Sequence, residues 1–209
     1  LMNLNTDYAP IPSPIPSNLL SLTSPTAIHT LVLNPSPEGQ RARRSIIYLH
    51  GTGGSQKLPC YLLAQRMPDA TILCPSVGLG GEWANERGEA TFHAVLDYAT
   101  PRSSAVYVVG QGYGGRGALH LLNRSLLGHI AGIVLLSGFD ENYFDAVRRS
   151  DIPILILRGE EDARTPAFRV EGLAHLDRVH NVEVAGGHYI LYENEDAVLE
   201  EIDNFCGAH

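Results

Sequence analysis

The chain has 209 residues, of which 44% are hydrophobic, and it carries a formal net charge of −8. This length suffices for one domain with a sizeable core. No apolar run approaches the roughly 20 residues that cross a bilayer, so we expect no membrane span. The acidic balance, without a stripe of Lys and Arg, argues against a nucleic-acid partner. The composition therefore favours a soluble globular protein.

The cysteines are few: Cys60, Cys74 and Cys206. An odd, sparse set predicts neither a disulfide framework nor a zinc site, and no other His, Cys or Asp residues show metal-ligand spacing. We therefore expect reduced, buried thiols, a cytoplasmic location, and no need for a metal or cofactor. The stretch from Leu1 to Pro25 has no basic segment followed by an apolar one, which predicts no signal peptide.

The beginning of the chain differs in composition from the rest. Residues 1–25 are rich in Pro, Ser and Asn, and four prolines between residues 10 and 16 alternate with small or apolar residues. Such a stretch is typical of an extended or partly disordered arm. We expect an arm over residues 1–25 and one domain over residues 26–209.

From residue 27 onward, short apolar runs alternate with helical patterns. Most of the runs are continuously apolar, as expected for strands buried on both faces of a parallel sheet. The predicted strands are Ile28–Leu33, Ser45–Leu49, Thr71–Cys74, Ala105–Val109, Ile133–Leu136, Ile154–Leu157 and Val182–Val184. The predicted helices are Leu58–Arg66, Glu89–Ala99, Gly115–Leu127, Pro166–Asp177 and one near the C-terminus through Val198, Ile202 and Phe205. This alternation predicts an α/β fold with a doubly wound, mostly parallel sheet and helices on both faces.

A glycine-rich turn follows the strand Ala105–Val109, in the stretch Val108-Val109-Gly110-Gln111-Gly112-Tyr113-Gly114-Gly115. It resembles the nucleophile elbow G-x-S-x-G of the α/β-hydrolase family, with Gly112 where that family has the serine. Small residues around the tip let the following helix pack close to the strand. Glycine tolerates the strained backbone of such a tip, so what the chain lacks here is the nucleophilic hydroxyl.

The same stretch allows two other interpretations. Gly110, Gly112 and Gly115 match the dinucleotide-binding fingerprint G-x-G-x-x-G, which also lies between a strand and a helix. That fingerprint usually follows the first strand of its fold, and it needs an acid about 20 residues on, for which Asp140 is only a loose candidate. A purely structural glycine turn is the other alternative.

Directly after the strand Ser45–Leu49 comes His50-Gly51-Thr52-Gly53-Gly54. It resembles the H-G-x-G-G loop that supplies one N–H of the oxyanion hole in the same family. The resemblance implies that the donors are the N–H of Thr52 or Gly53 together with that of Tyr113. We expect His50 to hold this loop in place and not to titrate in catalysis.

Two further motifs follow in the chain order of the family. Gly159-Glu160-Glu161-Asp162 resembles its G-x-x-D-x-x-x-P turn, which implies that Asp162 orients the catalytic histidine. The alternatives are that Asp162 caps the helix predicted from Pro166, or that Asp140 is the acid. Gly186-Gly187-His188 follows the last predicted strand, where the family has its histidine base.

The surroundings of the site are less defined by the sequence. Between Leu136 and Ile154 there is room for only a loop and one small helix, so the resemblance implies a family member without a large cap domain. Trp83, Phe139, Tyr143 and Phe144 follow strand ends and are candidates to line a substrate pocket, although ordinary packing under loops explains them equally well.

The resemblance implies a serine hydrolase that acts on small carboxylic esters or thioesters. With Gly112 at the nucleophile position, we expect this chain to be nearly inactive in that reaction. One alternative is an enzyme that uses Asp162 and His188 for proton transfer, as a lyase, cyclase or isomerase. Another is a protein that binds a small molecule without catalysis.

Overall fold

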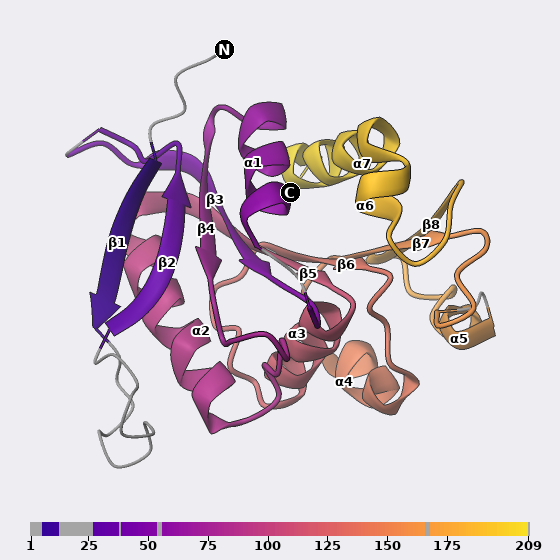
Figure 1. Cartoon of the computed structure of the whole chain (residues 1–209). Helices are drawn as coiled ribbons and strands as arrows, with labels where there is room; N and C mark the ends of the chain where they lie inside the picture. Colours follow the sequence, from indigo (N-terminus) through magenta and orange to yellow (C-terminus); the bar gives the residue numbers. More distant parts are fainter. Residues whose placement is uncertain (1–5, 13–26, 38, 54–55, 166–167, 209) are drawn as a thin grey trace.

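A computed structural model describes residues 6–12, 27–37, 39–53, 56–165 and 168–208. These residues form an eight-stranded sheet in the order β1-β2-β4-β3-β5-β6-β7-β8, covered by helices (Figure 1). The strands are β1 (Thr6–Pro12), β2 (Ala27–Leu33), β3 (Ala42–Leu49), β4 (Ala70–Pro75), β5 (Ser103–Gln111), β6 (Gly132–Leu136), β7 (Ile154–Gly159) and β8 (Val179–Val184). The helices are α1 (Lys57–Arg66), α2 (Glu86–Ala99), α3 (Tyr113–Asn123), α4 (Phe144–Arg149), α5 (Phe168–Glu171), α6 (Ile190–Glu193) and α7 (Glu195–Ala208), with 3-10 turns η1 (Thr100–Arg102) and η2 (Glu141–Tyr143).

The sheet is mostly parallel. Strands β4, β3, β5, β6, β7 and β8 pair in parallel, whereas β2 runs antiparallel to β4 and β1 runs antiparallel to β2. Parallel neighbours need a crossover, and helices α1, α2 and α3 lie in the crossovers from β3 to β4, from β4 to β5 and from β5 to β6. Each strand predicted from the sequence is present, so the predicted α/β sheet is confirmed.

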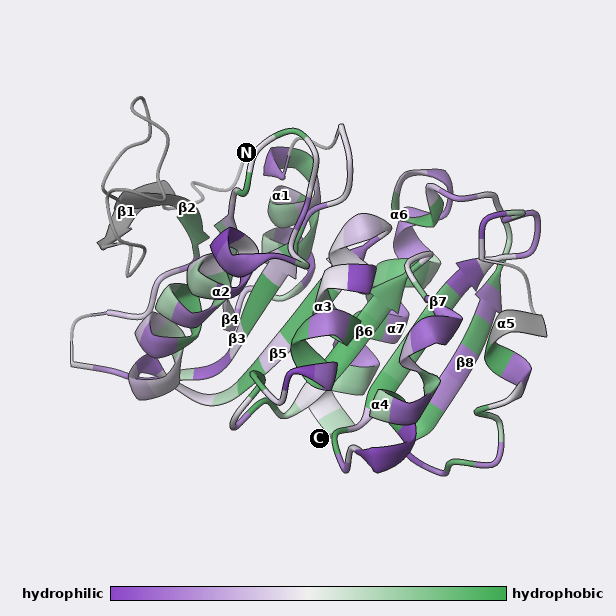
Figure 2. Cartoon of the chain, turned by 90° about the horizontal axis from the view of Figure 1, so that it is seen from below, coloured by the Kyte–Doolittle hydropathy of each residue, from purple (hydrophilic) through white to green (hydrophobic). Residues whose placement is uncertain are grey.

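Both faces of the sheet are buried, which explains the continuously apolar strands. Ile46 and Tyr48 pack in one core cluster with residues of α1, α6 and α7. Ile47 and Leu49, which alternate with them along β3, pack in the other cluster with residues of α2, α3 and α4. Figure 1 shows these two helix groups on opposite sides of the sheet, and Figure 2 shows the central strands β5 and β6 as strongly hydrophobic.

The connection between β6 and β7 holds only η2 and the short helix α4. This agrees with the prediction of a loop and one small helix in this gap. Within the described residues, no cap domain therefore covers the carboxyl ends of the parallel strands, where open α/β sheets bind their ligands.

The N-terminal arm is described only in part. Thr6–Pro12 is extended and forms the edge strand β1 through pairing with β2. Pairing with the sheet was not predicted, because the alternating prolines of this stretch are unusual in a strand. The remainder of residues 1–25, and the predicted boundary between residues 25 and 26, lie outside the described part of the chain.

The predicted helix over Pro166–Asp177 is wrong for most of its length. Pro166 lies outside the described residues, and α5 spans only Phe168–Glu171. Gly172 follows it, and glycine is a poor residue for continuing a helix. The chain then turns through i to i+3 hydrogen bonds, from the Leu173 N–H to the Val170 carbonyl and from the Leu176 N–H to the Leu173 carbonyl (both 3.0 Å).

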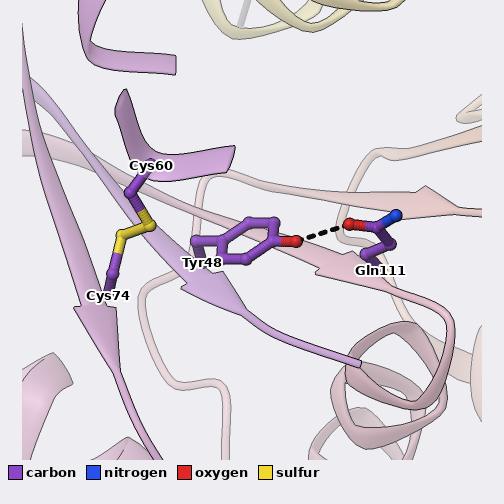
Figure 3. Close-up of a disulfide and its surroundings, with 4 residues drawn as sticks. All are labelled: Tyr48, Cys60, Cys74 and Gln111. Atoms are coloured by element: carbon purple, nitrogen blue, oxygen red, sulfur yellow. Dashed lines mark hydrogen bonds between the residues drawn. A yellow bond between two sulfur atoms is a disulfide. The ribbon is translucent and has the colours of Figure 1, made fainter. Parts of the chain in front are cut away.

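Two of the three cysteines are joined by a disulfide, contrary to the expectation of free thiols. Cys60 of α1 and Cys74 of β4 form the bond, with their Cα atoms 6.5 Å apart, beside Tyr48 (Figure 3). The sequence does not predict this pair, because α1 packs over β4 only in the folded chain. Cys206 is buried and free, and burial raises the pKa of its thiol to about 12. The cytoplasmic location stays a prediction, and the disulfide weighs against it.

Among the described residues, no helix combines the length and the apolar character that a membrane crossing requires.

Candidate active site

Strand β5 passes into helix α3 through a sharp turn at Gly112. Its backbone angles are φ 52° and ψ −114°, in the region that favours glycine. The Gly112 N–H donates to the Leu136 carbonyl (2.9 Å), and its own carbonyl accepts from the Arg116 N–H (3.1 Å). The turn is therefore pinned to β6 on one side and to α3 on the other, at the carboxyl end of the sheet.

The other glycines of this turn are required by close packing. A Cβ on Gly110 would lie 2.5 Å from the Gly114 carbonyl oxygen, and a Cβ on Gly115 would lie 2.8 Å from the backbone of Gly138. A Cβ on Gly114 would overlap the Leu49 carbonyl. This packing accounts for the spacing G-x-G-x-x-G without a nucleotide, and β5 is a central strand, not the first strand of the fold.

His188 faces the tip of the turn. A Cβ added to Gly112 would lie 3.6 Å from His188 Nε2, with no other described atom within 4 Å apart from its chain neighbours. His188 Nδ1 lies 3.1 Å from each carboxylate oxygen of Asp162. The structure thus brings together Gly112, Asp162 and His188 from three separate loops, as their order in the sequence predicts.

The Asp162 carboxylate is fully buried at its side chain. Burial acts to raise the pKa of Asp162, but hydrogen bonds from His188 and from the Arg164 N–H (2.9 Å) outweigh it, so the pKa lies below its usual value. Asp140, the other candidate acid, instead pairs with Arg116 (3.0 Å) and accepts from the Asn142 N–H (3.0 Å). The charged Asp162 carboxylate accepts a hydrogen bond from His188 Nδ1. The other ring nitrogen, Nε2, is then the one that can accept a proton.

The loop after β3 lies beside this turn, and a Cβ on Gly51 would lie 3.6 Å from the Tyr113 N atom. The Gly53 N–H already donates to the Leu79 carbonyl (2.8 Å). The prediction that Gly53 is an alternative to Thr52 as hydrogen-bond donor in the oxyanion hole is therefore wrong. The Thr52 hydroxyl donates to the Gly80 carbonyl (3.0 Å). Tyr113 is the first residue of α3, where the N–H has no partner within the helix.

His50 holds this loop by three interactions. Its Nδ1 lies 3.0 Å from the Gly51 carbonyl, its Nε2 accepts from the Val77 N–H (3.3 Å), and its own carbonyl accepts from Trp83 Nε1 (2.9 Å). Burial lowers the pKa of His50, and the hydrogen bond to Gly51 opposes this only in part. The imidazole is therefore neutral at pH 7 and serves the loop structure, as the sequence analysis expected.

A cavity of about 1020 Å³ opens above the turn. Its lining includes Gly112, His188, Thr52 and Phe139. The other three predicted pocket residues do not line it: Trp83 is buried beneath the His50 loop, Tyr143 packs edge-on against His120, and Phe144 packs against Phe139. Among the described residues, no group of three or more His, Cys, Asp or Glu side chains could hold a metal ion.

Several lining residues were missed by the sequence analysis: Tyr48, Leu58, Gln111, Tyr189 and Tyr192. Two of them carried a positional signal, because Gln111 directly precedes Gly112 and Tyr189 directly follows His188. The others come from the end of β3, the start of α1 and helix α6. Their convergence depends on the tertiary arrangement, which no local pattern reveals.

Comparison with known proteins supports the fold. No family profile matches the sequence, and no curated protein matches it. Among solved structures, the chain is similar to a dienelactone hydrolase from Anabaena variabilis (TM-score 0.73, 16% identity, covering 99% of this chain and 98% of that one). It is also similar to an esterase from Pyrococcus furiosus (0.71, 11%, 98% and 90%) and to a serine hydrolase without lid from Xanthomonas campestris (0.69, 13%, 96% and 93%). The chain therefore has the α/β-hydrolase fold, and its described residues include no large cap domain.

Proposed function

We propose that this chain is built as a serine hydrolase for small carboxylic esters or thioesters, with Gly112 at the nucleophile position. The observation that carries the proposal is the 3.6 Å between His188 Nε2 and a Cβ at residue 112, behind which Asp162 holds the imidazole. A side chain at this position would meet only the base. The esterase and hydrolase structures of the same fold support the same class of substrate.

With serine at residue 112, the hydroxyl would attack the ester carbonyl while His188 takes its proton. His188 would then protonate the leaving group, and a water would complete the hydrolysis. Asp162 would keep the imidazole in the productive tautomer, and the N–H groups of Thr52 and Tyr113 would stabilise the oxyanion. Without the hydroxyl, no acyl-enzyme can form. Removal of the serine from a catalytic triad lowers turnover by about a million-fold.

A second candidate function rests on the intact pair of Asp162 and His188. His188 Nδ1 contacts both carboxylate oxygens of Asp162 even though residue 112 is glycine. His188 also lines the cavity in which a ligand would bind. The pair would accept a proton from a bound substrate, and the N–H groups of Thr52 and Tyr113 would stabilise the resulting enolate. This chemistry suits a lyase, a cyclase or an isomerase.

The test is turnover of p-nitrophenyl esters and acyl-thioesters by the native chain and by its Gly112→Ser variant. We expect a burst followed by steady hydrolysis from the serine variant, and at most a trace from the native chain. Gly112→Ala is the control for the side-chain bulk, and adding His188→Ala to Gly112→Ser should remove the regained activity. A folded Gly112→Ser variant without hydrolysis would refute the hydrolase proposal and favour proton transfer or binding.

A further inference from the structure

A buried hydrogen-bonded pair, Tyr48 and Gln111, lines the cavity next to the turn. Gln111 is the last residue of β5 and directly precedes Gly112, whereas Tyr48 lies near the end of β3. The Tyr48 hydroxyl donates to Gln111 Oε1 at 2.6 Å (Figure 3). This length is typical of a bond between two oxygens and short for one from an amide nitrogen. The carbonyl end of the Gln111 amide therefore faces Tyr48.

The amide nitrogen of Gln111 is left for a ligand. Figure 3 shows it on the side away from the Tyr48 hydroxyl, and it donates no hydrogen bond to the described part of the chain. Tyr48 is 1% exposed and packs in the same core cluster as Cys60 and Cys74. Burial raises the pKa of Tyr48 well above its usual value, so the hydroxyl stays a donor and holds the amide in one orientation.

Apolar side chains form the walls around this donor. The described chain has six exposed large hydrophobic side chains, and four of them line the cavity: Leu58, Tyr113, Tyr189 and Tyr192. Such walls bind aromatic or alkyl groups, and one oriented polar group among them determines which ligand fits. A ligand that covers the Gln111 amide without offering an acceptor would leave its N–H groups buried and unpaired.

We propose that Gln111 is a specificity-determining residue that selects aromatic or alkyl esters carrying a second carbonyl oxygen beside the reacting one. Tyr48 is the positioning residue that aims the amide. The second oxygen is expected near the reacting carbonyl because Gln111 directly precedes Gly112 in the chain. The inference rests on the proposed binding of esters in this cavity, but it does not require turnover.

The test measures binding of two esters to the native chain by calorimetry. Methyl benzoylformate and methyl phenylacetate differ only in a C=O or a CH₂ beside the ester. We expect the native chain to bind the first ester about 3- to 10-fold more tightly, the worth of one neutral hydrogen bond. Gln111→Leu should bind both esters equally, while Gln65→Leu, which removes an exposed amide from α1, should keep the preference.

A second variant keeps the test decisive if Gln111→Leu does not fold. Tyr48→Phe removes the hydroxyl and keeps the ring, so the amide is free to turn and the preference should shrink by at least half. If Tyr48 had a purely structural role, Tyr48→Phe would lower the affinity for both esters by the same factor. Failure of either ester to bind, equal binding by the native chain, or a preference that survives both variants would overturn the inference. Hydrolysis by Gly112→Ser tests the proposed function independently.

Discussion

At the residue scale, the chemistry of the site depends on which atoms surround His188. Its Nδ1 is engaged by a buried carboxylate and its Nε2 points to the tip of the turn at Gly112. The imidazole is therefore oriented and polarised whether or not a nucleophile is present. In the proposed hydrolase, the hydroxyl that would connect this base to an ester is the part of the site that Gly112 lacks.

Asp162 has a predicted role that a single substitution tests in the Gly112→Ser background. Asp162→Asn keeps the shape of the side chain but presents an amide N–H to His188 Nδ1, which favours the unproductive tautomer. We expect turnover of p-nitrophenyl acetate to fall by about 10⁴-fold. Asp145→Asn, at an exposed carboxylate of α4, is the matched control. Equal loss in both variants would contradict the role of Asp162.

The lowered pKa of Asp162 also predicts a pH dependence of stability. A carboxyl whose pKa is lower in the folded chain stabilises it fully above the ordinary value of 3.8, and this contribution is lost as the pH falls through the folded pKa. Urea unfolding between pH 6 and pH 2.5 should therefore show a smaller acid-induced drop in Asp162→Asn than in the native chain. An identical drop would contradict the pKa shift.

At the scale of elements, the site depends on how closely α3 approaches the sheet. The first turn of α3 packs on the ends of β3 and β6 with no room for side chains at Gly114 and Gly115. This approach positions the N-terminus of the helix beside the loop that begins at His50. The backbone contacts that shape the cavity floor are thus built from glycines.

Gly114→Ala tests this approach. The added methyl group would overlap the Leu49 carbonyl, a backbone atom that no rotamer change can move. We expect the free energy of unfolding, measured with urea, to fall by about 1–3 kcal/mol. Gly207→Ala is the control, because its Cβ would meet nothing within 4 Å in helix α7, and alanine should be neutral or stabilising there. Equal midpoints for the two variants would contradict the packing argument.

At the scale of the whole molecule, long-range contacts join segments that are distant in the chain. Arg44 of β3 bonds to Asp69 before β4 (2.9 Å) and to Asp203 of α7 (2.7 Å). The disulfide joins α1 to β4. The carboxyl end of the sheet stays open because η2 and α4 are all that stands between β6 and β7.

At this scale, the disulfide is expected to stabilise the folded molecule. It closes a loop with a sequence separation of 14 between Cys60 and Cys74, which restricts the unfolded chain. We expect reduction, or the double variant Cys60→Ala/Cys74→Ala, to lower the free energy of unfolding by about 2–4 kcal/mol. Cys206→Ala should not change the response to reductant. Two alkylatable thiols at Cys60 and Cys74 in the purified, oxidised protein would contradict the bond.

Much of the fold followed from local patterns. Each predicted strand from Ile28 to Val184 is present, and four of the five predicted helices lie where they were expected: α1, α2, α3 and α7. Helix α3 ends at Asn123, before the predicted end at Leu127. The prediction failed where a neighbour in space decides the outcome. The helix after residue 166 stops at Glu171, where Gly172 follows and the chain turns through the Leu173 N–H to Val170 carbonyl bond. The proline-rich stretch pairs with β2 as an edge strand.

The sequence alone determined the doubly wound sheet and the order of Gly112, Asp162 and His188 along it. Buried strands, glycine turns and residues that follow strand ends are local features, and parallel strands bring their carboxyl ends to one edge. Only the tertiary structure decided that Cys60 meets Cys74, that the Gly53 N–H is occupied, and that Tyr48 aims Gln111 into a cavity walled by tyrosines. Each of these depends on distances between residues far apart in the chain, which packing sets and no sequence pattern records.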